Sequence, residues 1–169
     1  MIHYLSRYVF PLKLIPWRSV RSWHCSSCGD CCKRYTVQIT IQEWLNLSKT
    51  FGYDFVTQDL SGFYLGKTAD GSCPFLWRSM GRILCGIQGM KPLACKIWPF
   101  RILDRPKYGR ADEAHFNYRN RDFYVYLVPR CVGINWGKPS EHLVKIVIPE
   151  FIDVKLGLQK RQLYSTALR

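Results

Sequence analysis

Four of the chain's eight cysteines lie within eight residues, at Cys25, Cys28, Cys31 and Cys32. Two residues between successive cysteines let a tight turn aim both sulfurs at one ion, and Gly29 can adopt the positive φ that such a turn often needs. If the chain is extended at Cys31 and Cys32, these side chains point to opposite sides. We therefore predict that the two neighbours serve two adjacent centres.

The other four cysteines are scattered singly along the chain, at Cys73, Cys85, Cys95 and Cys131. Most of them lie beside turn signals or at the ends of predicted strands, where side chains from separate loops can meet. Eight thiols at four per centre give two tetrahedral zinc sites or two four-iron clusters. One centre with four structural cysteines is the alternative.

Disulfides are a further alternative for eight cysteines, as are buried thiols without a ligand. A disulfide framework belongs to secreted chains, which are usually shorter than these 169 residues. The first 24 residues have no clean apolar segment and no small-residue cleavage site. We therefore predict a reducing compartment, either the mitochondrial matrix or the cytoplasm, in which clustered cysteines hold metal.

The cysteines lie within several short motifs. They are the run Cys25–Cys32, then Cys73-Pro74-Phe75-Leu76, Cys85-x-Ile87, Pro92-x-x-Cys95, Pro99-Phe100 and Cys131-x-Gly133. Together they resemble the CxxCxxCC cysteine-cluster family of zinc- or iron-chelating domains, over about residues 23 to 137. The resemblance implies that all eight cysteines are metal ligands for zinc or iron. With four thiols per centre, the cofactors are two zinc ions or iron–sulfur clusters.

The same resemblance offers an enzyme hypothesis, because a related cysteine-rich domain occurs in proteins resembling flagellin lysine methylases. The alternative function is therefore an iron–sulfur enzyme of the lysine N-methylase-like kind. The sequence contains no dinucleotide-binding glycine motif, no P-loop and no zinc-protease motif. Motifs alone therefore assign no reaction to the chain.

The remaining sequence predicts a small α+β domain with short strands, a few helices and loops clustered around the metal–thiolate sites. Thr40-Ile41-Gln42-Glu43 matches a capping box, so we expect a helix from there to about Gly52. A second helix is expected from Ser140 to 148, broken or kinked at Pro149 and resumed to 163, with a strand as the alternative at 144–148. Short strands are expected at 35–39, 63–65 and 82–84, and a hairpin at 116–118 and 123–128.

The chain is divided into three predicted parts. Residues 1–22 form a basic extension, residues 23–137 the metal-binding domain, and residues 138–169 a helical region with a basic tail. The extension contains Arg7, Lys13, Arg18 and Arg21 and no acidic residue. It is either a mitochondrial targeting segment or an ordinary basic arm. No apolar run is long enough to span a membrane.

The formal charge of +13 predicts an anionic partner, with RNA or a ribonucleoprotein as the leading candidate. Eight thiolates and two Zn²⁺ ions together carry four negative charges, which still leaves +9. Trp17, Trp23, Tyr108 and Tyr118 lie among basic residues and could stack on bases. The alternative is a solvated basic face with these aromatic residues in the core.

Two further side chains near the cysteine run are of types that can bind metal. His24 adjoins Cys25, but eight thiols already satisfy two tetrahedral sites, so we expect it to be exposed or to support a ligand. Asp30 lies inside the run, where we expect it to make turn hydrogen bonds.

Overall fold

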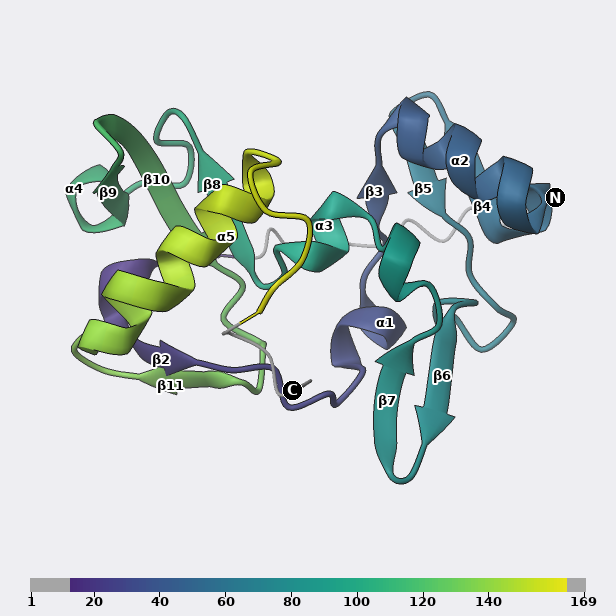
Figure 1. The fold of residues 1–169 in the computed structure, drawn as a ribbon, viewed down its shortest axis with the longest axis horizontal. Helices are drawn as coiled ribbons and strands as arrows, with labels where there is room; N and C mark the ends of the chain where they lie inside the picture. The colour runs from purple at the N-terminus through teal and green to yellow at the C-terminus, as the bar shows by residue number, and fades with distance from the viewer. Residues whose placement is uncertain (1–12, 164–169) are drawn as a thin grey trace, which may run out of the picture.

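The computed structural model, which describes residues 13–163, places two groups of helices and strands side by side, with α1 and α3 between them (Figure 1). The helices are α1 (Asp30–Arg34), α2 (Ile41–Phe51), α3 (Leu93–Lys96), α4 (Ala111–Ala114) and α5 (Ile148–Lys155). The strands are β1 (Ile15–Pro16), β2 (Val20–Trp23), β3 (Gln38–Ile39), β4 (Val56–Asp59), β5 (Gly62–Leu65), β6 (Leu76–Ser79), β7 (Arg82–Cys85), β8 (Phe100–Leu103), β9 (His115–Tyr118), β10 (Arg121–Leu127) and β11 (Ile134–Trp136). The predicted small α+β domain is confirmed.

The first half is built on an antiparallel sheet in which β10 pairs with β1, β8 and β9, while β2 pairs with β11 beside it. The predicted hairpin is present as β9 and β10, with Arg119 and Asn120 at positive φ in its turn. Strands β1 and β2 come from residues 15–23, so the end of the 1–22 segment pairs with the sheet. Residues 1–12 of that predicted extension lie outside the described residues.

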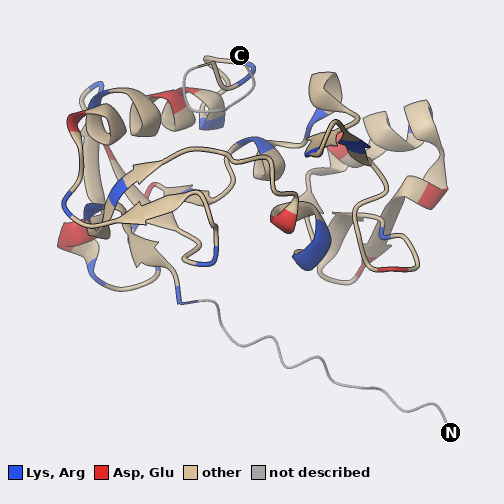
Figure 2. Ribbon diagram, turned by 90° about the horizontal axis from the view of Figure 1, so that it is seen from below, with Lys and Arg blue, Asp and Glu red and all other residues tan. Residues whose placement is uncertain are grey.

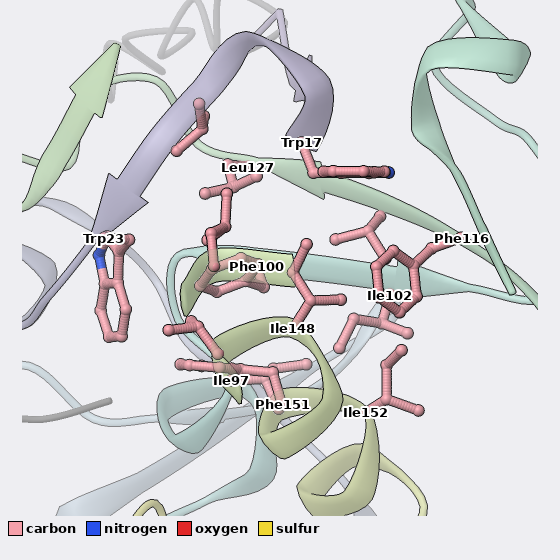
Figure 3. Close-up of a cluster of buried hydrophobic side chains, with 14 of the residues drawn as sticks. Trp17, Trp23, Ile97, Phe100, Ile102, Phe116, Leu127, Ile148, Phe151 and Ile152 are labelled. Atoms are coloured by element: carbon pink, nitrogen blue, oxygen red, sulfur yellow. The ribbon is translucent and has the colours of Figure 1, made fainter. Parts of the chain in front are cut away.

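A hydrophobic core lies between this sheet and α5 (Figure 3). The Trp23 ring meets Phe100 and Phe151 edge to face, with centroids 5.5 Å and 5.1 Å apart. Trp17 and Trp23 are only 6% and 4% exposed. Both indoles are therefore core residues, because burial of such large apolar surface is favourable, and the expectation that they stack on RNA bases is wrong.

The C-terminal helix departs from the prediction at its end. The Ser140 Oγ accepts a hydrogen bond from the Leu143 N–H at 3.2 Å, as a helix cap does. A π-helix at Leu143–Val147 then leads directly into α5, which has Pro149 in its first turn. Proline is tolerated there because its missing N–H is not needed. The helix ends at Lys155, so both the second helical piece to residue 163 and the alternative strand are wrong.

The second half combines α2 with the sheet β3-β5-β4. The capping box is confirmed: the Glu43 N–H donates to Thr40 Oγ1 at 3.2 Å, and the Thr40 N–H donates to Glu43 Oε2 at 2.8 Å. The other carboxylate oxygen of Glu43 accepts from the Leu93 N–H at 2.7 Å, which ties α2 to α3. Of the strand predicted at 35–39, only Gln38–Ile39 forms.

This half has its own, smaller core, formed by the buried residues Ile39, Leu47, Val56, Leu65, Phe75 and Ile87. The hairpin β6–β7 projects beside it, and its strand β7 includes the predicted 82–84 strand (Figure 1). No helix among residues 13–163 has the length and apolar character to cross a bilayer.

Candidate metal centre

The cysteine run is fixed against the β6–β7 hairpin. Gly29 has a φ of +70°, as predicted, and precedes α1. A Cβ at Gly29 would lie 2.4 Å from Ile83 Cγ2, and the Ile83 N–H donates to the Ser27 carbonyl at 3.1 Å. Only glycine combines this conformation with such a close approach, so the sequence places the run directly on β7.

The adjacent cysteines Cys31 and Cys32 lie in helix α1 and not in extended chain. Successive residues of a helix are about 100° apart around its axis, and the two Sγ atoms are 3.9 Å from each other. Two sulfurs of a tetrahedral zinc site, each about 2.3 Å from the ion, are about 3.8 Å apart. The expectation of opposite directions is therefore wrong, and this pair could reach one ion or two neighbouring ones.

The second thiol group consists of Cys32, Cys73, Cys85 and Cys95. The Cys73 N–H donates to the Cys32 carbonyl at 2.7 Å, which fixes the loop of Cys73 against α1. Cys85 ends β7, and Cys95 lies on α3.

The thiols of this group lie within one another's electric fields. Burial is the main cause that raises the pKa of Cys95 to about 12, and the neighbouring Cys85 and Cys73 thiolates act in the same direction. Burial also raises the pKa of Cys73, and the Cys85 and Cys31 thiolates act in the same direction. A divalent ion at this position would reverse the effect, because it stabilises the thiolate form.

The first thiol group consists of Cys25, Cys28 and Cys131. Burial raises the pKa of Cys131, and the Cys25 and Cys28 thiolates raise it further. Two hydrogen bonds to the sulfur of Cys131 oppose them: the Trp23 indole N–H donates at 3.3 Å, and the Gly133 N–H donates as well. Such donors support a thiolate, as outer partners of metal ligands do.

Gly133 brings the Cys131 loop against the cysteine run. The His24 N–H donates to the Gly133 carbonyl at 3.2 Å, and a Cβ at Gly133 would lie 2.0 Å from the His24 carbonyl oxygen. Residues more than one hundred positions apart in the sequence are thus held in backbone contact.

Each thiol group belongs to one half of the fold. Cys25 and Cys131 pack against the first core, while Cys73, Cys85 and Cys95 pack against the second. All eight cysteines are free thiols. Among residues 13–163, no three thiol, imidazole or carboxylate groups converge closely enough to hold an ion as they stand. The fold gathers the thiols into two neighbourhoods, and binding would require the sulfurs to close further.

The other candidates near the run take different roles. His24 is exposed, as expected. The Asp30 carboxylate accepts from Arg34 Nε at 2.7 Å, an ion pair within α1 and not the turn hydrogen bonds that we expected. The sequence did not reveal Trp23 as a donor to Cys131, or Lys91 as a cation acting on Cys31 and Cys95. No local pattern pairs these residues.

A family model matches residues 24–131, more than half of the chain and including all eight cysteines. The chain belongs to the CxxCxxCC family. The family is described as a "putative zinc- or iron-chelating domain". Neither curated proteins nor solved structures gave a match to this CxxCxxCC domain. The donor set fits the family's description, since thiolates are the soft ligands that zinc and iron–sulfur clusters prefer.

Proposed function

We propose that this protein is a metal–thiolate domain in which two centres join the two halves of the fold. The observation that carries the proposal is the division of the thiols: one group packs on each core, and the run Cys25–Cys32 contributes to both. A metal held between the run and either group would crosslink segments that are distant in sequence. Such a centre contributes its binding energy to folding.

The ligands of the two proposed centres follow from this grouping. Cys32, Cys73, Cys85 and Cys95 hold the second centre. Cys25, Cys28 and Cys131 hold the first, with Cys31 as the fourth ligand, because it is the one thiol that remains and four thiolates complete a tetrahedral site. The metal is zinc in the leading version of the proposal and an iron–sulfur cluster in the other.

Metal analysis of cysteine variants tests this assignment. We expect two zinc ions per wild-type chain, one in Cys131→Ser, one in Cys73→Ser and none in the double variant. Ser26→Ala, an exposed change within the run, should keep two. One ion per wild-type chain that either substitution removes would instead indicate a single centre. Iron with acid-labile sulfide and a band near ~400 nm would identify clusters and favour the iron–sulfur enzyme related to lysine N-methylase-like proteins.

We further propose that the basic surface docks on RNA or a ribonucleoprotein. Lys and Arg residues are spread over both halves of the ribbon (Figure 2), and the chain carries +13. Tyr108 is 42% exposed in a loop with Arg105 and Lys107, and the Lys107 Nζ lies 5.9 Å from the Tyr108 ring centroid. The Tyr126 hydroxyl donates to the Gly109 carbonyl at 2.9 Å and fixes this loop. A cation beside an exposed ring suits a phosphate and its base.

Salt-dependent binding tests the RNA proposal. Lys107→Gln should weaken binding of a single-stranded RNA and reduce the slope of log K against log salt by about 0.7, the value for one lost phosphate contact. Lys49→Gln removes the same charge from an exposed position on α2 and should leave the slope unchanged. Retention on RNA that does not change with salt would contradict the proposal.

A further inference from the structure

A cavity of about 1030 Å³ opens between the two thiol groups. Six cysteines line it, namely Cys25, Cys28, Cys31, Cys85, Cys95 and Cys131. Its volume is at the upper end of the range for small-molecule sites, about 300–1,000 Å³. The rest of its wall carries basic and aromatic side chains, which metal binding alone does not need.

Five cations line this cavity: Lys91, Lys96, Arg130, Lys160 and Arg161. Its one carboxylate, Asp30, is already paired with Arg34. None of the five cations forms an ion pair with a carboxylate among residues 13–163. The charge of Lys91 favours the thiolate forms of Cys31 and Cys95, so this cation supports metal binding. The other four cations remain available to a ligand, and cations gathered at a concave surface attract anions.

Aromatic rings form another part of the wall. The rings of Tyr35 and Trp98 pack with centroids 4.3 Å apart, and Trp77 on β6 lies 60% exposed at the cavity. Arg130 lies close enough to Tyr35 for its charge to act on the phenol. The cavity therefore presents ring faces and cations together, which is the combination that binds a base and its phosphate.

The segment after α5 is held at this cavity by its own hydrogen bonds. The Gln162 side-chain amide donates to the Lys96 carbonyl. The Gln159 amide donates to the buried Glu150 carboxylate at 3.0 Å. These two anchors flank Lys160 and Arg161 and place both cations at the wall before any ligand arrives. Such preorganisation lowers the cost of binding.

We propose that this cavity binds a nucleotide, either free or as a unit of an RNA chain. Its phosphate meets the cations of Lys96, Arg130, Lys160 and Arg161, and its base packs on the exposed face of Trp77. This nucleotide site is additional to the metal centres, because Arg130 and Trp77 have no thiol and are not metal ligands.

Calorimetric titration of the metal-loaded full chain with AMP tests the proposal. We expect AMP to bind at least tenfold more tightly than adenosine. Arg130→Gln and Trp77→Ala, both at exposed positions, should each weaken AMP at least tenfold. Two controls lie outside the cavity: Lys107→Gln matches the lost charge, and Trp136→Ala, at 55% exposed, matches the lost ring. Both should bind AMP like the wild type.

Metal content, measured on every sample, separates this proposal from the preceding one. Full metal content with no AMP binding would overturn the nucleotide site and leave the metal centres intact. Equal binding of AMP and adenosine would overturn it, and so would equal losses in the Lys107 control. A short single-stranded RNA that displaces AMP would identify the ligand as part of RNA, whereas AMP binding unaffected by that RNA would identify a free nucleotide.

Discussion

Removing the bound metal is expected to unfold the second half of this protein while the sheet of the first half persists. Among residues 13–163, the first core contains seventeen buried hydrophobic residues and the second only six. Structural zinc contributes about 10–16 kcal/mol in small metal-dependent folds, which is comparable with the whole stability of a domain, about 5–15 kcal/mol. The smaller core would therefore depend on the proposed second centre far more than the larger core depends on the first.

Hydrogen exchange after treatment with a strong chelator measures this difference. Amides of β3, β4 and β5 should lose protection, and amides of β8 and β10 should keep most of theirs. The midpoint of thermal unfolding should fall by more than 20 °C, because each kcal/mol of lost stability lowers it by about 2–4 °C in a chain of this size and by about 4–8 °C in smaller domains. Restoring the metal should restore the protection. Unchanged thermal stability after verified metal removal would contradict the structural role.

Among single glycine-to-alanine substitutions in this chain, Gly133→Ala is expected to cause the largest loss of stability. The new Cβ would lie 2.0 Å from the His24 carbonyl oxygen and 3.2 Å from the Trp23 indole nitrogen. The first of these neighbours is backbone and cannot rotate away, so the Cys131 loop must lift off the cysteine run. We expect a loss of about 3 kcal/mol or more in the free energy of unfolding, the upper end for an overpacked site.

Denaturant unfolding of Gly133→Ala beside Gly89→Ala measures this effect. A Cβ at Gly89 would meet nothing within 4 Å, so that substitution should change the free energy of unfolding by less than about 1 kcal/mol. Gly133→Ala should also lose one metal ion per chain while Gly89→Ala keeps both. Equal free energies of unfolding of the two variants would show that the contact of Gly133 with His24 does not stabilise the loop of Cys131.

Local signals in the sequence predicted local structure well. The capping box at Thr40 and Glu43 placed the start of α2, and Gly29 was predicted as a residue able to adopt a positive φ in the turn of the cysteine run. These features depend on the chemistry of a few adjacent residues. The end of α5 at Lys155 was not predicted, although a local signal marks it. Gly157 has a φ of +75°, and the N–H groups of Gly157 and Leu158 donate to the Val154 and Asp153 carbonyls, as at helix ends closed by glycine.

Long-range pairings could not be read from the sequence. Spacing suggested two centres, but it did not indicate that Trp23 donates to Cys131 or that Gly133 contacts His24. The two indoles at Trp17 and Trp23 have basic neighbours in the chain, yet the sheet turns both into the core. The prediction for the adjacent cysteines considered only the case of an extended chain, because the five-residue helix α1 is too short for a periodic pattern to reveal it.

The division of the thiols between two cores has a consequence for biosynthesis. The partners of Cys32 in the proposed second centre all precede residue 96, whereas the first centre needs Cys131, which lies beyond β10. A chain emerging from the ribosome completes the second set of ligands while the strand that positions Cys131 is still being made, and amino-terminal parts fold first during synthesis. The small core would thus acquire its ion early. The large core, whose helix α5 follows Cys131 in the chain, would form later, together with the first centre.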